Sequence, residues 1–192
     1  MGSDYLLKIV IVGEPLELNA QMVHLQKNPE IPSTQSFLYG FDIHPRDMVI
    51  EQSTVRLLLV YQTTPLISDE IIKKYYNNRE EFKKDYREHY KHEYGRMRPS
   101  LYRGASLCII TYDKSTRDSF NDVEGWYSDI RAILPSVPIG LVGFITASDN
   151  ITTDEGHALA NRLGLRFFET TPTDAKKVIE IYESLVRPFL AT

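Results

Sequence analysis

The stretch LLKIVIV at residues 6–12, followed by GEPLELNA at residues 13–20, decides the fold. Its first half is an apolar run interrupted only by Lys8, and it ends at Gly13, which is how a buried first strand leads into a phosphate-binding turn. A working turn of this kind reads G-x-x-x-x-G-K-[ST], and the eight residues from Gly13 match it only at the first glycine. The stretch therefore predicts a strand, a turn and a helix in the outline of such a site.

The chemistry expected of that turn is missing from its residues. Leu18 stands in place of the second glycine, Asn19 in place of the lysine that binds phosphate, and Ala20 in place of the hydroxyl residue that binds Mg²⁺. Glu14 and Glu17 add two carboxylates where phosphate would sit. Residual phosphate binding through backbone N–H groups is the alternative, although a proline in the turn removes one donor. We therefore expect a turn that is closed by its own side chains.

Composition indicates one soluble domain. The chain has 192 residues, of which 42% are hydrophobic and 25% are charged, and such a length can bury a substantial core. Its net charge of -4 argues against a dedicated nucleic-acid binder, which would be basic. The one cysteine, Cys108, lies in an apolar run and is expected to be buried, so that no disulfide forms within the chain and a reducing compartment is favoured.

Membrane attachment is expected to be indirect. No stretch is long enough to span a bilayer, and the first residues lack the basic start of a signal peptide. The last residues, VRPFLAT at 186–192, contain no cysteine for a prenyl group. We therefore predict a cytoplasmic protein with no direct membrane anchor, which would reach a membrane through a partner.

Strand and helix signals alternate along the chain. Strands are predicted at residues 6–12, 40–44, 55–61, 107–112, 139–145 and 166–169. Helical spacing follows in three places, marked by Phe120, Val123, Trp126, Ile130 and Ile133, then by Leu159 and Leu163, and then by Val178, Ile181, Tyr182 and Leu185. This order predicts an α/β sandwich with a mostly parallel sheet.

Polar residues mark the ends of these helices. Asp118 and Ser119 are candidate caps for the first helix. Thr152 and Glu155 form a plausible capping box for the second, which should stop at Gly164. The third should end before Pro188, because proline cannot continue a helix.

Residues 66–98 interrupt the alternation with a charged, tyrosine-rich helical insert. Opposite charges four residues apart, such as Glu80 and Lys84, support one long helix or two helices broken near Asn77. An aromatic face runs along it and is our candidate partner-binding surface, because tyrosine is favoured at interfaces. Its residues are Ile72, Tyr75, Tyr76, Phe82, Tyr86, Tyr90 and Tyr94.

Other interpretations of the insert stay open. The aromatic face could equally pack on its own domain, and binding to a membrane surface is disfavoured by the mixed charge. His89, His92 and Glu93 have the spacing of metal ligands on a helix, but a solvated face is the better interpretation in so charged a segment. We expect no metal, no cofactor and no catalytic set of residues anywhere in the chain.

The combination of motifs is specific for one family. In order along the chain they are DYLLKIVIVG at 4–13, LYRGAS at 101–106, YDKSTRDSFNDVEGWYSDI at 112–130, LVG at 141–143 and FFETT at 167–171. With these motifs the chain resembles a Ras-superfamily small GTPase, most closely the Rab branch. The resemblance implies a P-loop NTPase fold over residues 1–192, with six strands in a three-layer sandwich, and it places the insert where the second switch region would lie.

The family's nucleotide-contacting positions hold unexpected residues here. The switch threonine falls near Leu38, and the D-x-x-G-Q motif falls on residues 61–65, so that Tyr61 replaces the metal-linked aspartate, Thr64 the glycine and Pro65 the glutamine. The guanine-reading N-K-x-D falls on residues 144–147 (FITA), and the final S-A-K falls on 171–173 (TPT). Several of the new residues, Leu18, Leu38, Phe144 and Ile145, are apolar, as if they filled the pocket.

These replacements predict a loss of nucleotide chemistry. A hydrogen bond to a charged group contributes about 1.5–3 kcal/mol, so four or five lost contacts remove roughly 6–15 kcal/mol. We therefore expect a nucleotide-independent Rab-like pseudoGTPase, not an enzyme, that binds protein partners in trafficking through the insert and the switch-like surface, without Mg²⁺, guanine nucleotide or nucleic acid. The alternative is a divergent small GTPase with noncanonical GTP or GDP binding and little hydrolysis. An enzyme of another kind would need a new cluster of ionisable groups, which we do not find.

Overall fold

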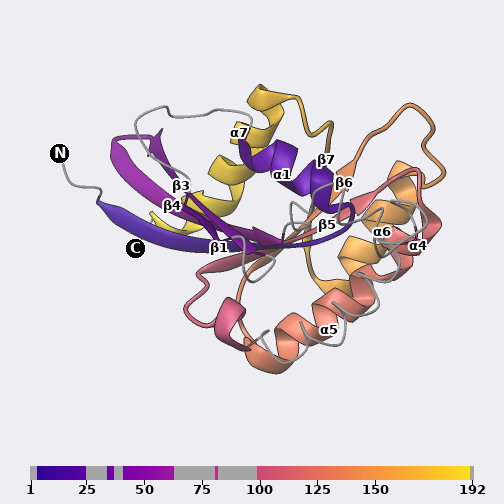
Figure 1. The fold of residues 1–192 in the computed structure, drawn as a ribbon, viewed down its shortest axis with the longest axis horizontal. Helices are drawn as coiled ribbons and strands as arrows, with labels where there is room; N and C mark the ends of the chain where they lie inside the picture. The colour runs from indigo at the N-terminus through magenta and orange to yellow at the C-terminus, as the bar shows by residue number, and fades with distance from the viewer. Residues whose placement is uncertain (1–3, 25–33, 37–40, 63–80, 82–98, 191–192) are drawn as a thin grey trace.

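A sheet in the strand order β2-β3-β4-β1-β5-β6-β7 forms the centre of the computed structural model, which describes residues 4–24, 34–36, 41–62, 81 and 99–190 (Figure 1). The strands are β1 (Tyr5–Gly13), β2 (Thr34–Ser36), β3 (Phe41–Ile50), β4 (Ser53–Gln62), β5 (Leu107–Asp113), β6 (Ile139–Phe144) and β7 (Arg166–Thr170). The helices are α1 (Leu16–His24), α4 (Arg117–Asn121), α5 (Val123–Ile133), α6 (Thr153–Leu163) and α7 (Ala175–Val186), with a final 3-10 turn, η1 (Arg187–Phe189).

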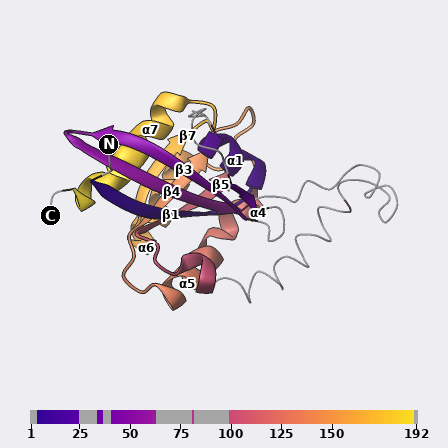
Figure 2. The same cartoon turned by 60° about the vertical axis from the view of Figure 1, so that its left-hand side comes forward.

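The predicted fold class is confirmed. From β4 through β1, β5 and β6 to β7 all neighbours pair in parallel, and only β2 and β3 at one edge run antiparallel to their neighbours. Helices α1 and α7 lie on one side of the sheet and α4, α5 and α6 on the other, so that the strands form the middle of three layers (Figures 1 and 2). Six strands were expected, and the seventh is the short β2, whose three polar residues carry no strand pattern.

Two apolar clusters hold the helices on the sheet. Inward residues of β1 and β4, such as Ile9 and Leu57, pack with α1 and α7 on one face. On the other face, β5 and β6 contribute Ile110 and Leu141, which pack with α4, α5 and α6. Strands β5 and β6 are buried along almost their whole length because helices cover both of their faces, as is usual for the central strands of a parallel sheet.

Strand β3 differs from its prediction in a way that matters for the site. The predicted strand at 40–44 is observed as a ten-residue strand, 41–50, that alternates between buried and exposed residues. The alternation is inverted in polarity, because Asp42, His44 and Arg46 point inward while the apolar Val49 is 70% exposed. The prediction stopped at residue 44, although the second half of the strand buries the apolar Met48 and Ile50.

Helix ends follow the prediction at two of three places. Thr152 and Glu155 form a capping box, and α6 stops at Gly164, whose φ of 68° is left-handed. The predicted caps of α4 are wrong, because Thr116 is the N-cap residue. The Ser119 hydroxyl is used elsewhere, since it accepts a hydrogen bond from the backbone N–H of Asp113 at 3.0 Å.

The insert predicted at 66–98 lies outside the described residues, apart from Glu81, which is helical and exposed. The proposed partner-binding residues lie outside them as well, namely Ile72, Tyr75, Tyr76, Phe82, Tyr86, Tyr90 and Tyr94. The same holds for the alternative metal ligands His89, His92 and Glu93. These assignments and the single-domain boundary at 1–192 therefore stay predictions.

Candidate functional site

The turn between β1 and α1 brings Gly13 against the backbone of β5. Gly13 has φ of 110°, and a Cβ atom there would lie 2.1 Å from the carbonyl oxygen of Thr111. Only glycine fits this position, because the backbone of one strand lies where a side chain would begin. The prediction of a strand, a turn and a helix at this place is confirmed.

Asn19 occupies the position that the resemblance assigns to the phosphate-binding lysine. Its side chain is fully buried, and its Nδ2 donates a hydrogen bond to the carbonyl oxygen of Gly13 at 3.1 Å. Its Oδ1 lies 2.7 Å from the hydroxyl of Thr111, which also lies 3.0 Å from the carbonyl oxygen of Val12. Asn19 thus ties α1 to the turn and to β5, because its amide supplies both a donor and an acceptor.

Tyr61, at the end of β4, lies in a buried chain of polar groups. Its hydroxyl donates to Oδ2 of Asp42 at 2.9 Å and lies 2.6 Å from Nε2 of His24. Because the hydroxyl has one hydrogen and gives it to Asp42, Nε2 of His24 is the donor in the second bond. Burial, followed by the bond to Asp42, raises the pKa of Tyr61 well above its usual value.

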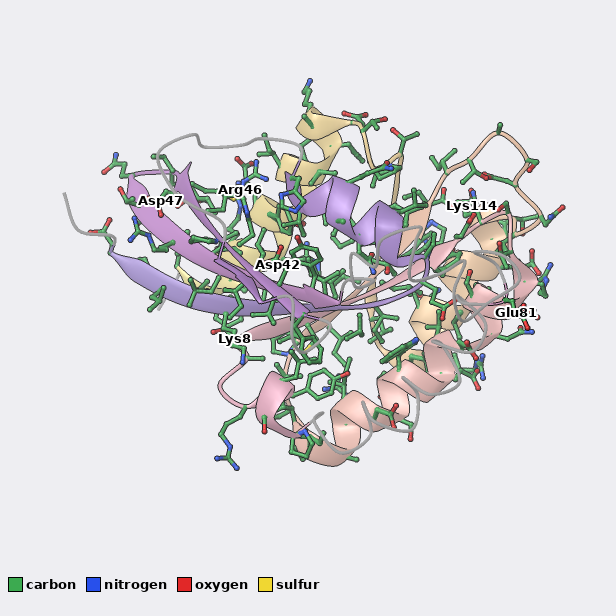
Figure 3. All side chains as sticks on the ribbon, viewed as in Figure 1. Lys8, Asp42, Arg46, Asp47, Glu81 and Lys114 are labelled. Carbon is green, nitrogen blue, oxygen red and sulfur yellow. The ribbon has the colours of Figure 1, made fainter. Side chains whose placement is uncertain are left out.

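The buried polar groups continue along β3 toward α7, and together they form the polar row, which consists of His24, Asp42, His44, Arg46 and Tyr61. His44 is 4% exposed, and its ring meets that of His24 edge to face at a centroid distance of 5.1 Å. Further along, the guanidinium of Arg46 lies 5.7 Å from the centroid of the Tyr182 ring. Asp42 and Arg46 lie between β3 and the layer of α1 and α7, whereas Lys8 points to the opposite side of the sheet (Figure 3). Strand β3 thus places polar groups where the rest of this face is apolar.

Burial lowers the pKa values of two residues in this row, His44 and Arg46. It is the largest cause that lowers the pKa of His44, and the neighbouring His24 lowers it further, while Asp42 opposes the shift. Burial also lowers the pKa of Arg46. His44 therefore loses more by leaving water than it gains from the carboxylate of Asp42, and for Arg46 burial outweighs the opposing effect of Tyr182.

The region predicted to correspond to the base-reading motif is closed by a different network. Phe144 is fully buried in the core, but Ile145 is 38% exposed, so the expectation that apolar residues fill the pocket holds for the first and is wrong for the second. Leu18 is half-buried against the core of the α1 and α7 face, and Leu38 lies outside the described residues. In the final motif Pro172 is buried between two exposed threonines.

Lys114 is a residue of this region that the sequence did not single out. Its side chain is labelled in Figure 3. It is 5% exposed and forms ion pairs with Glu169 at 2.7 Å and with Asp149 at 3.2 Å. Burial lowers its pKa, but the bonds to Glu169 and Asp149 outweigh burial and raise it. A lysine directly after a buried strand is the signal that could have revealed it.

The minor assignments made from the sequence are consistent with the structure. The carboxylate of Asp113 accepts hydrogen bonds from the N–H and the hydroxyl of Ser115, both at 2.7 Å, as is expected of an aspartate in a turn. Cys108 is fully buried, and burial raises its thiol pKa to about 12. Trp126 is half-buried against the second cluster. In the part of the chain that the structure describes, no group of three potential ligands could hold a metal, and no helix is long and apolar enough to cross a membrane.

Comparison with known proteins identifies the relatives of this chain. The family model described as Ras family matches residues 90–191. Ras-related protein Rab-2B of Dictyostelium discoideum is 34% identical over 95 residues, which cover 47% of this chain and 47% of that protein. Ras-related protein RabQ of the same organism is 23% identical over 193 residues, which cover 98% and 82%. Ras-related protein RABD1 of Arabidopsis thaliana is 39% identical over 87 residues, which cover 43% and 42%. In the matches at 34% and 39% identity, the chain spans less than half of the relative's length.

One expectation is corrected by these relatives. From the sequence we predict that the chain is not an enzyme and that GTP hydrolysis is absent. The matching family consists of GTP-hydrolysing enzymes, and nothing in the geometry above shows that the activity has been lost, so this expectation is wrong.

Proposed function

Because the chain belongs to the Ras family, we propose that it is a Rab-like member that acts in membrane trafficking as a protein-interaction module, and that its partner-binding form does not depend on guanine nucleotide. The proposal places the protein in the cytoplasm, with a partner bringing it to a membrane. The proposal concerns the contacts that stabilise the partner-binding form of the protein, and hydrolysis of GTP is a separate property.

The contacts of Asn19 carry the proposal. In the turn after β1, the group at the lysine position is engaged with protein atoms on both of its polar ends, namely Gly13 on one side and Thr111 on the other. A lysine at this position would present its charge to phosphate, whereas the amide of Asn19 has no charge and has its partners within the fold. These contacts stabilise the turn from inside the fold, which supports a partner-binding form that does not depend on nucleotide.

Tyr61 supports the same interpretation at the metal side of the site. A carboxylate there would bind Mg²⁺ through the metal's water or directly, but the phenol of Tyr61 is neutral at physiological pH, and burial raises its pKa further. Its hydroxyl is engaged by Asp42 and His24. Strand β4 is therefore joined to β3 and α1 by protein groups at the place where the family uses a metal ion.

The proposed partner surface includes the aromatic face of residues 72–94 and an exposed part of the sheet. On the side of the sheet away from α1 and α7, three apolar side chains are exposed at the β1, β3 and β4 edge: Leu6 by 62%, Ile43 by 41% and Val49 by 70%. Ile43 and Val49 lie on the same face of β3, and exposed apolar side chains of this kind can contact a protein partner. Substituting Ile43 and Val49 with serine should weaken partner capture while the melting temperature stays within a few degrees.

Nucleotide content and affinity test the proposal directly. The purified protein is denatured, the supernatant is analysed for GDP and GTP by ion exchange, and the native protein is then titrated with each nucleotide and Mg²⁺ by calorimetry. A Ras GTPase carried through the same purification is the positive control. We expect no bound guanine nucleotide and no binding heat up to millimolar ligand. Co-purified nucleotide or micromolar affinity would refute nucleotide independence.

The second candidate is a GTP-hydrolysing member that holds its nucleotide through unfamiliar contacts. Family membership favours it, together with the retained strand, turn and helix around Gly13. Phosphate release from GTP, measured in the same samples, distinguishes the two candidates. Release above that of a heat-denatured sample would support this second function.

A further inference from the structure

The polar row beneath the end of α1 contains one ring nitrogen with no partner. Nδ1 of His44 is buried and makes no hydrogen bond in the part of the chain that the structure describes. The ring of His44 packs against His24, the last residue of α1, and His24 is bonded to Tyr61. Side chains of these three residues are thus the polar connection from the end of α1 to β3 and β4.

We propose that His44 and His24 form an acid-sensitive latch, which holds the C-terminal end of α1 on β3 at neutral pH and releases it in mildly acidic solution. The inference is independent of nucleotide binding. It rests on the burial of His44, on the unpartnered Nδ1 and on the edge-to-face contact of the two rings.

The groups around His44 disfavour a positive charge on its ring. From α1 it faces His24, from its own strand Asp42 and Arg46, and from β4 the neutral Tyr61 beside Asp42. On α7, Tyr182 lies beside Arg46 and is neutral. Among the described residues, the carboxylate that acts on His44 is Asp42, which is already engaged by the hydroxyl of Tyr61 and by the backbone N–H of Ile43. A proton on His44 would therefore add a cation beside Arg46 in a buried place.

The direction of the pH effect follows from linkage. Because the pKa of His44 is lowered in the closed state, an opened state in which the ring meets water binds more protons below the ordinary value of 6.5. Closure is then fully favoured above pH 6.5 and is weakened as the pH falls below it. One group can shift the opening equilibrium by at most about tenfold for each pH unit in that range.

Hydrogen exchange of α1 tests the latch. Protection factors for residues 16–24 are measured by mass spectrometry at pH 7.5 and 5.5 on the full chain, and corrected for intrinsic exchange rates, with α7 as an internal reference. We expect α1 of the wild type to lose protection by up to roughly tenfold at pH 5.5, relative to α7. In His44→Phe, which keeps an aromatic ring against His24 but cannot titrate, α1 should keep its protection.

A matched variant separates the latch from a general response of histidines to acid. His157 on α6 is exposed and packs on Phe167, far along the chain from α1, so His157→Phe should lose α1 protection as the wild type does. A wild type without pH-dependent loss, or a His44→Phe variant with the wild-type loss, would overturn the proposal. Should His44→Phe fail to fold, His44→Gln replaces it. If neither variant folds, NMR titration of the wild-type His44 ring decides: a midpoint below 6.5 that coincides with α1 opening supports the latch, and one at or above 6.5 overturns it.

Discussion

The hydroxyl of Tyr61 should be worth a measurable part of the stability of the protein. Tyr61→Phe removes one oxygen from a side chain that is 1% exposed and leaves the ring in place, so that packing is almost unchanged. The change deletes the bonds to Asp42 at 2.9 Å and to His24 at 2.6 Å. The carboxylate of Asp42, which is 5% exposed, keeps the N–H of Ile43 as its other donor.

The expected cost follows from these contacts. A hydrogen bond to a charged group contributes about 1.5–3 kcal/mol, and the second bond adds about 0.5–1.5 kcal/mol. We therefore expect Tyr61→Phe to lower the free energy of unfolding by roughly 2–4 kcal/mol. In a protein of this size, each kcal/mol lowers the melting temperature by about 2–4 °C, so the expected fall is roughly 4–16 °C.

The chain supplies a matched control in Tyr112→Phe. Tyr112 is also fully buried, but its hydroxyl has no hydrogen-bond partner among the described residues. Removing that oxygen deletes no bond and takes away a buried hydroxyl that has no partner, so the free energy of unfolding should stay the same or rise. Urea unfolding at pH 7.5, followed by circular dichroism for the wild type and both variants, measures the difference.

Two results would refute this reasoning. If Tyr61→Phe lost less than about 0.5 kcal/mol, the bonds to Asp42 and His24 would not stabilise the folded chain. Equal losses in Tyr61→Phe and Tyr112→Phe would mean that the cost comes from changing a buried tyrosine of any kind. In both cases the polar row would lose its role in joining α1 to β3.

Three further predictions concern the turn and the cap of α6. Asn19→Ala and Thr111→Val should each destabilise the protein by about 1–3 kcal/mol, and a double-mutant cycle should show coupling of about 0.5–3 kcal/mol, because the two side chains bond to each other at 2.7 Å. Purely additive losses would contradict the contact. Gly13→Ala should cost about 3 kcal/mol or more in urea unfolding, since its Cβ would lie 2.1 Å from the backbone oxygen of Thr111, and a loss below about 1 kcal/mol would speak against this turn. The pKa of Glu155 is lowered to about 2, first by its bond to Arg117 and then by those in the capping box, so its stabilising effect is present above pH 4.5 and is lost as the pH falls from 4.5 toward 2. Glu155→Gln should flatten that part of the stability profile, and an unchanged profile would contradict the assignment.

The local sequence patterns predicted the elements that are apolar and regular. The run before Gly13, the strands at 107–112 and 139–145, and the capping box at Thr152 are all found within a residue or two of their predicted places. Each of these signals lies within a few neighbouring residues, since strand burial, helix spacing and capping are local properties. The alternation of these elements then restricts the fold to a helix-covered parallel sheet.

The polar contacts of the site could not be predicted in that way. Asn19 and Thr111 are 92 residues apart, and Tyr61 and Asp42 belong to different strands, so that only the packed sheet brings them within hydrogen-bond distance. The sequence shows that a lysine and an aspartate are absent from their usual places, but it does not show what the new side chains touch.

Strand β3 shows most clearly which features follow from the local sequence and which follow from the tertiary structure. Its residues have the alternation of a strand, and the sequence by itself determines that successive side chains point to opposite faces. Which face is buried was decided by the tertiary structure, in which α1 and α7 cover the side of Asp42, His44 and Arg46. Burying those groups is favourable only where partners such as Tyr61 meet them, because an unpaired polar group pays the full cost of leaving water. The chain alone therefore set the elements and their order, whereas the polar centre beneath α1 exists only because the folded sheet brings distant residues together.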